Sequence, residues 1–169
     1  VWRYASFAPK RHAFAIARRE AEKRGFGPES KKRVQLVTDG DNDLAVYAKE
    51  YLPHALHSID VMHVIEKLWT AGESLYEEGT PACIAWVQKQ KDDLYRGRAA
   101  KIVAHLQQRF DETPKTGPGN KGKRERLDAV IGYIEKRLDR LGYDKLIVED
   151  LELGTGAVEG AIKNTIGKR

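Results

Sequence analysis

Residues 34–40 have the sequence Val-Gln-Leu-Val-Thr-Asp-Gly, a compact run rich in β-branched residues that stops abruptly at Asp39-Gly40. Such a run is typical of a buried strand that delivers an acidic residue at its carboxyl end. The strand ends of α/β sheets form crevices lined by loops, where ligand-binding groups often lie. Asp39 is therefore a candidate functional residue, and the alternative interpretation is an ordinary Asp-Gly turn.

Strands and helices are predicted to alternate around this run, which indicates an α/β fold. The expected strands lie at residues 1–7 and 56–59, and the expected helices at residues 11–24, 43–52 and 60–76. Gly25 and Gly27 would end the first helix, and Pro53 the second. Asp43 and Asp60 would cap the second and third helices at their N-termini.

The character of the chain changes after Pro81, where helical patterns dominate. Amphipathic helices are expected at residues 82–95, 98–110 and 123–141, and the next strand only at residues 146–148. The segment 113–124 is rich in Pro, Gly and Lys, which predicts an exposed basic loop. A Gly-rich turn from Gly154 then leads into a final helix, with Thr155 as one possible N-cap. An all-helical block is thus expected inside an α/β frame.

Length and composition bound the class of protein. A chain of 169 residues can close one hydrophobic core but is too short for two ordinary domains with a linker. Apolar residues make up 41% and charged residues 33%, which excludes a membrane protein and a fully disordered chain. The apolar stretches are too short to span a bilayer. We expect one soluble, folded domain.

Cysteine content and charge give weaker indications. The single Cys83 cannot form an internal disulfide and lacks partners at zinc-ligand spacing, which argues against structural zinc and fits a protein inside the cell. Lys plus Arg number 30 against 25 Asp plus Glu, and the net charge of +5 favours contact with phosphate backbones without proving it. Because the chain begins at Val1 without an initiator Met, we expect it to be a fragment of a longer protein.

Glu159 is the second candidate acid, because helical spacing places it on one face with Ile162 and Ile166. A half-buried carboxylate needs a partner, which is either Lys163 one turn on or a metal ion. Two carboxylates brought together without a cation would repel each other. A shared Mg²⁺ is the natural reason for Asp39 and Glu159 to converge.

Asp60 and His63 lie on one face of a predicted helix and invite a metal-binding interpretation. The plainer alternative makes Asp60 an N-cap and His63 a first-turn residue. The run from Asp39 to Asp43 imitates a calcium loop, but Leu44 stands where an EF-hand needs glycine, and a strand precedes it. An EF-hand is excluded.

The remaining candidates are basic and aromatic. The basic residues of segment 113–124 could hold phosphates, with Gly119 and Gly122 allowing close backbone approach, or could belong to a solvated linker. Four aromatic residues at apolar helix positions are expected in the core rather than as base-stacking platforms. They are Trp69, Trp86, Tyr95 and Tyr133.

Taken together, these residues resemble bacterial DDE transposases of the ISKra insertion-sequence group, which are distantly similar to Mutator-like transposases. The resemblance covers essentially the whole chain, and it depends on the order of motifs that are each weak alone. These motifs are Val37-Thr38-Asp39-Gly40 before a helix, Leu52-Pro53, Asp60-Val61-Met62-His63, and Gly156-Ala157-Val158-Glu159-Gly160 after a helical block.

The resemblance implies an RNase H-like α/β fold, with a mixed sheet whose first strands lie upstream of Val1 and a large all-helical insertion. Residues 1–63 would form the first part of the core, residues 64–145 the insertion, and residues 146–169 the return to the core. The resemblance also implies an Asp-Asp-Glu triad that binds two divalent ions, Mg²⁺ or Mn²⁺.

Within this triad, the resemblance makes Asp39 the second acid and Glu159 the last, and both are expected metal ligands. Asp60 and His63 match the accessory Asp-x-x-His motif of that superfamily. The first Asp is expected upstream of Val1, because no strand-borne Asp precedes Asp39. The fragment alone is therefore expected to be inactive.

The implied reaction cleaves DNA at insertion-sequence ends and transfers the strands to target DNA. The expected setting is a homo-oligomeric synaptic complex in the bacterial cytoplasm, at the nucleoid and away from any membrane. Residues expected to hold the DNA backbone are Lys115, Lys121, Lys123, Arg124, Lys163, Lys168 and Arg169. Two alternatives stay open: a metal-dependent nuclease of the same fold that cleaves without joining, and a non-catalytic DNA-binding or assembly module.

Overall fold

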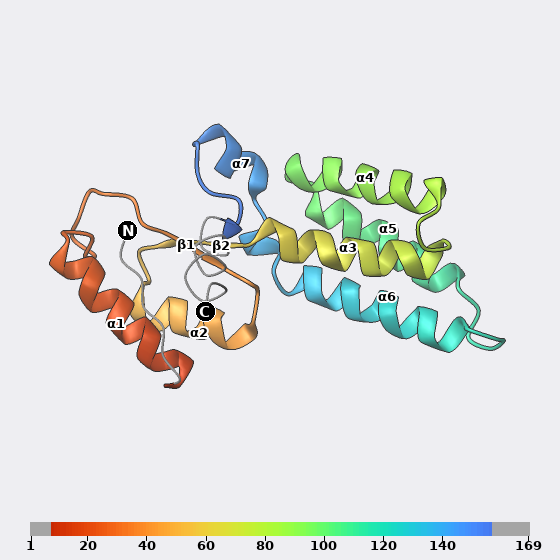
Figure 1. The fold of residues 1–169 in the computed structure, drawn as a ribbon, viewed down its shortest axis with the longest axis horizontal. Coiled ribbons are helices and arrows are strands. Elements are labelled where there is room, and N and C mark those ends of the chain that lie inside the picture. Colours follow the sequence, from red (N-terminus) through yellow and green to blue (C-terminus); the bar gives the residue numbers. More distant parts are fainter. Residues whose placement is uncertain (1–7, 157–169) are drawn as a thin grey trace, which may run out of the picture.

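Two short parallel strands connect a pair of helices to a larger helical bundle in the computed structural model, which describes residues 8–156 (Figure 1). The strands are β1 (Gln35–Thr38) and β2 (Leu56–Ile59). The helices are α1 (Lys10–Lys23), α2 (Asn42–Tyr51), α3 (Val61–Leu75), α4 (Pro81–Tyr95), α5 (Ala99–Glu112), α6 (Asn120–Glu135) and α7 (Tyr143–Val148), with a 3-10 turn η1 (Leu138–Arg140).

The strands and α2 form a β-α-β unit, as the sequence pattern predicts. β1 pairs with β2 in parallel, and the register places Thr38 opposite Ile59. Asp39 and Asp60 directly follow these two residues. Both acids therefore lie at the same edge of the sheet, where the carboxyl ends of the two strands meet.

Helices α1 and α2 pack against each other on one side of the sheet (Figure 1). The rings of Phe14 and Tyr47 lie 5.8 Å apart, and Arg11 donates to Glu50 at 2.7 Å. The predicted N-cap of α2 at Asp43 is wrong, because the side chain of Asp41 accepts the Asp43 amide instead. Asp43 lies in the first turn, where its charge favours the helix dipole.

Helices α3 to α6 form the bundle that the sequence predicts as an all-helical block. Its core contains fully buried aliphatic side chains from facing helices, including Leu68, Leu94, Leu106 and Ile134. α3 and α4 approach closely at Gly72, where a Cβ atom would lie 2.8 Å from the Cγ2 atom of Val87. Of the four aromatic residues expected in the core, Trp86 is buried. The other three are partly buried against the core: Trp69, Tyr95 and Tyr133.

Two predicted elements differ from the structure. The helix expected at residues 123–141 begins at Asn120 and ends at Glu135, and η1 follows it. The strand expected at residues 146–148 is wrong, because these residues form the end of α7. Tyr143 and Leu146 are buried at helical spacing while Val148 is exposed, and a short apolar run does not distinguish a strand from a helix.

The chain returns from the bundle to the sheet after α7. The backbone of Glu152 exchanges two hydrogen bonds with the Gln35 side chain, at 2.7 and 3.0 Å. The amide of Val61 donates to the Leu153 carbonyl at 2.8 Å. The final part of the described chain thus lies against the two strands.

The strand predicted at residues 1–7 and the helix predicted to carry Glu159 lie outside the described residues. Among residues 8–156, the architecture is mixed α/β and mostly helical, with a small parallel sheet. None of the helices in this range has the length and apolar character needed to cross a membrane.

Candidate functional site

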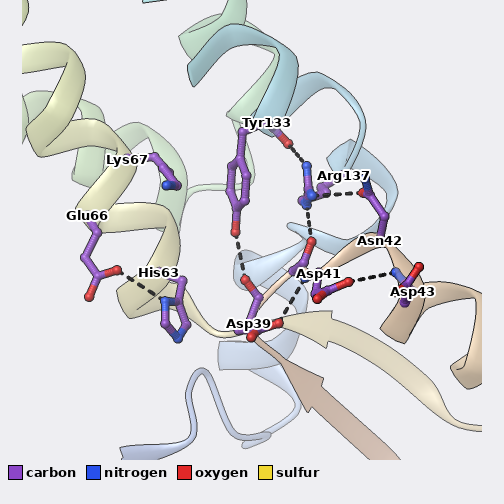
Figure 2. Close-up of a pocket in the computed structure, with 10 residues that line it drawn as sticks. Asp39, Asp41, Asn42, Asp43, His63, Glu66, Lys67, Tyr133 and Arg137 are labelled. Atoms are coloured by element: carbon purple, nitrogen blue, oxygen red, sulfur yellow. Dashed lines mark hydrogen bonds and ion pairs between the residues drawn. The ribbon is translucent and has the colours of Figure 1, made fainter. Parts of the chain in front are cut away.

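An open pocket of about 500 Å³ lies at the carboxyl edge of the sheet, where the β1–α2 loop meets α3 and the end of α6 (Figure 2). Acidic and basic side chains face each other across it. The lining residues are Asp39, Gly40, Asp41, Asn42, Asp43, His63, Glu66, Lys67, Tyr133 and Arg137.

Asp39 places an exposed carboxylate in this pocket. Its Oδ1 atom accepts the amide of Asp41 at 2.9 Å, which is the local Asx turn expected of such a residue. Its Oδ2 atom has no hydrogen-bond partner among residues 8–156. One carboxylate oxygen of Asp39 therefore remains available to a ligand.

The neighbouring acid Asp41 is engaged in holding α2. Asp41 caps the helix and forms an ion pair with Lys10. The hydrogen bond from Lys10, followed by that from the Asp43 amide, lowers the pKa of Asp41. Asp41 therefore stays ionised at neutral pH while serving the helix.

The facing wall of the pocket comes from α3. His63 is half-buried, and its Nδ1 atom lies 3.2 Å from a carboxylate oxygen of Glu66, one turn further along the helix. Lys67 places its ammonium group 5.5 Å from the centre of the Tyr133 ring. Figure 2 shows His63 beside Glu66 at the start of α3.

Asp60 is close in sequence to this wall but differs in environment, because the residue is only 2% exposed. One oxygen accepts the Met62 amide at 2.8 Å, which confirms the predicted N-cap. The other accepts the Thr155 amide at 2.7 Å and the Thr155 hydroxyl. Burial alone would raise the pKa of Asp60, but the hydrogen bonds from Thr155 and Met62 outweigh it and lower the pKa.

The carboxylates that line the pocket are suitable ligands for a hard cation, since Mg²⁺ and Mn²⁺ prefer carboxylate oxygens. Asp39, like Asp43 and Glu66 in the same pocket, has a carboxylate oxygen without a partner among residues 8–156, whereas Asp60 has both oxygens in hydrogen bonds. Within residues 8–156, no three His, Cys, Asp or Glu side chains converge as a metal-binding group.

The predicted DNA-binding residues lie in different parts of the chain: one in a loop, three in α6, and three outside the described residues. Lys115 is exposed in the α5–α6 loop, whereas Lys121, Lys123 and Arg124 belong to the first turns of α6 rather than to a loop. Arg124 donates to the carbonyls of Phe110 and Thr113, both at 2.7 Å, and so holds the end of α5. Lys163, Lys168 and Arg169 lie outside the described residues.

Sequence reasoning missed the contribution of α6 to the pocket. Tyr133 donates from its hydroxyl to the Asp39 carbonyl at 3.0 Å, and Arg137 donates to the Gly40 carbonyl at 2.7 Å. Their spacing of four residues on a predicted helix was the available signal. That spacing could not indicate which distant loop they would contact.

No family model matches the chain, and no curated protein or solved structure matches it either. A functional assignment therefore depends on the motif order and on the geometry of this pocket.

Proposed function

We propose that this chain is part of the catalytic domain of a DDE transposase with an RNase H-like fold, as its motif order implies. The observation that carries the proposal is the contrast between two acids at one sheet edge. Asp39 is exposed in an open pocket with one oxygen free, whereas Asp60 is buried with both oxygens in hydrogen bonds. Asp39 is thus the acid available for catalysis, and Asp60 supports the edge.

The path of the chain supports Glu159 as the second available acid. Thr155 is hydrogen-bonded to Asp60, and Glu159 follows four residues later in the sequence. Four residues span at most about 14 Å when fully extended, so Glu159 is within reach of the edge that carries Asp39. The upstream Asp would complete the triad.

The reaction needs hard oxygen ligands and no covalent protein nucleophile. Bound Mg²⁺ or Mn²⁺ would activate a water or a DNA 3′-hydroxyl and stabilise the leaving 3′-oxygen. Asp39 and Glu159 would hold the ions. His63 has its Nδ1 atom engaged by Glu66, and its position on the pocket wall suits the accessory role that its motif implies.

The proposed partners are insertion-sequence ends and target DNA, bound by a homo-oligomer at the bacterial nucleoid. The α5–α6 loop, which contains Lys115, and the first turn of α6, which contains Lys121, lie at the end of the bundle far from the sheet (Figure 1). Both lysines are exposed, and we assign them to contacts with the DNA backbone. The bundle would then extend the DNA-binding surface beyond the catalytic edge.

The test is to introduce Asp39→Asn and Glu159→Gln separately into the full-length protein. Each variant is expected to lower DNA cleavage in Mg²⁺ by about 100-fold or more, because metal ions stabilise the transition state by several kcal/mol. Asp128→Asn, at an exposed position of α6, is the matched control and should cleave normally. Normal transposition by either test variant would show that the acids are assigned wrongly.

Pre-cut DNA ends with a free 3′-hydroxyl distinguish a transposase from a nuclease of the same fold. The proposal requires the unaltered protein to join these ends to target DNA, and requires Asp39→Asn to lose the joined product. Cleavage of uncut DNA without any joining would identify a nuclease instead.

A further inference from the structure

Arg137 is a buried arginine at the end of the helical bundle, and its contacts are unusual for a buried charge. The residue is only 7% exposed, yet within residues 8–156 the acceptors of its side-chain hydrogen bonds are all neutral. They are the carbonyls of Gly40 and Tyr133, at 2.7 and 2.8 Å, and the amide oxygen of Asn42, at 3.0 Å. A buried charge is costly unless its donors are satisfied, so this arrangement indicates a specific structural role.

Two of these acceptors belong to the loop that carries Asp39. Arg137 contacts the residues at positions 40 and 42, and the Tyr133 hydroxyl donates to the carbonyl of Asp39 itself. The guanidinium also lies 4.0 Å from the centre of the Tyr133 ring, so each side chain supports the other.

The conformation of Gly40, in the loop that carries Asp39, allows these contacts. Gly40 has a φ of +90°, a backbone conformation that favours glycine. A Cβ atom there would lie 2.5 Å from the Tyr133 hydroxyl and 3.1 Å from Arg137 Nε. The backbone of Gly40 therefore approaches α6 more closely than a side chain would allow.

We infer that Tyr133 and Arg137 are positioning residues for Asp39: by holding the carbonyls of Asp39 and Gly40 against α6, they direct the Asp39 carboxylate into the pocket. Neither side chain needs to contact substrate for this role. The helical bundle thereby sets the geometry of an acid that belongs to the sheet. This inference rests on the proposed function of Asp39 as a metal ligand.

The test uses Arg137→Gln and Tyr133→Phe in the full-length protein, with DNA cleavage measured over a range of Mg²⁺ concentrations. Groups that orient a metal ligand typically change metal affinity or activity about 10–100-fold when removed. The Mg²⁺ concentration for half-maximal cleavage is therefore expected to rise by about 10-fold or more in Arg137→Gln, and less in Tyr133→Phe. Arg137→Lys keeps the charge but loses the planar fork, and should rescue only in part.

Amide hydrogen exchange supplies a readout that does not depend on activity. The amides of Asp41 and Asp43 are hydrogen-bonded to side chains of the same loop, at 2.9 and 2.8 Å. Their exchange should become faster in Arg137→Gln, while exchange in α3 to α5 stays unchanged. Lys136→Gln removes a neighbouring exposed charge and is the matched control for both measurements.

The outcomes separate the inference from the proposed function. If Asp39→Asn keeps full activity, the proposed function fails. If Asp39→Asn is inactive while Arg137→Gln and Tyr133→Phe keep the normal Mg²⁺ dependence, the positioning role is wrong. Equal loss of exchange protection throughout the bundle would also overturn it, because Arg137 would then support global stability alone.

Discussion

Asp60 shows how the environment of one carboxylate fixes its role. It follows a strand of the same small sheet as Asp39, but it is buried and accepts hydrogen bonds from Met62 and Thr155. These bonds favour the charged form and lower the pKa below its ordinary value, although burial opposes the shift. The stabilisation from Asp60 is thus present above the pKa of an unfolded Asp, about 3.9, and is lost as the pH falls through the lower folded value.

Acid titration of stability tests this role of Asp60. The free energy of unfolding is expected to fall between about pH 5 and pH 2, and to fall less steeply in Asp60→Asn than in the unaltered protein. At pH 7 the variant should be less stable by about 1.5–3 kcal/mol, the usual contribution of hydrogen bonds to charged groups. Urea denaturation at several pH values measures both effects, with Asp128→Asn as an exposed control. Parallel pH curves for Asp60→Asn and the unaltered protein would contradict the role.

The hydrogen bond between two residues close in the sequence could be predicted, and those between residues far apart in the sequence could not. The cap of α3 joins Asp60 to an amide two residues away, so sequence spacing alone predicts it. The bond from Thr155 to Asp60 spans 95 residues, and that from Tyr133 to Asp39 spans 94. No periodicity in one sequence indicates such pairs. The same limit explains why Arg137 was missed.

Among the elements, two helical glycines differ only in what surrounds them. A Cβ atom at Gly72 of α3 would lie 2.8 Å from Val87 and 3.3 Å from the Cys83 sulfur. A Cβ atom at Gly132 of α6 would meet nothing within 4 Å. Helix propensity alone favours alanine over glycine by about 0.8–1.0 kcal/mol at either position.

Gly72→Ala and Gly132→Ala are therefore expected to change stability in opposite directions. Gly132→Ala should stabilise the fold by about 0.4–1 kcal/mol through lower chain entropy of the unfolded state. Gly72→Ala should destabilise it by about 1–3 kcal/mol, the usual cost of overpacking a core. Thermal unfolding measures both. An increase in melting temperature for Gly72→Ala would show that α3 and α4 can move apart at little cost.

The elements themselves were largely predictable, because long amphipathic patterns and β-branched runs repeat with distinct periods. Both described strands and the helices of the bundle follow these patterns. The exceptions are short or terminal. The run at residues 146–148 carries three apolar residues without enough length to show a period, and the start of α6 at Asn120 lies within a Gly- and Lys-rich segment.

For the whole molecule, the placement of charge predicts how binding to DNA depends on salt. Lys115, Lys121 and Lys123 gather around the α5–α6 loop, and the chain carries a net charge of +5. Each phosphate contact releases counterions and contributes about 0.9 to the slope of log affinity against log salt. Arg124 is excluded from this set because it holds the end of α5.

A triple change of Lys115, Lys121 and Lys123 to Gln is expected to weaken DNA binding and reduce the salt slope by up to about 3. Fluorescence anisotropy with duplex DNA at several salt concentrations measures both quantities. The control replaces three exposed lysines elsewhere: Lys31, Lys49 and Lys136. Equal effects in both triple variants would mean that net charge, rather than this cluster, governs the interaction.

The hydrogen bonds between Asp60 and Thr155 also bring the two ends of the helical segment together. They join the points where the chain leaves the sheet and returns to it, closing a loop of 95 residues, for which the closure entropy amounts to about 4 kcal/mol. We expect that a helical segment whose ends meet in this way can be exchanged for helices of other lengths without displacing the strands. An exchange that preserves Asp39 must retain the end of α6 and the residues that follow it, because Tyr133 and Arg137 contact the loop from there.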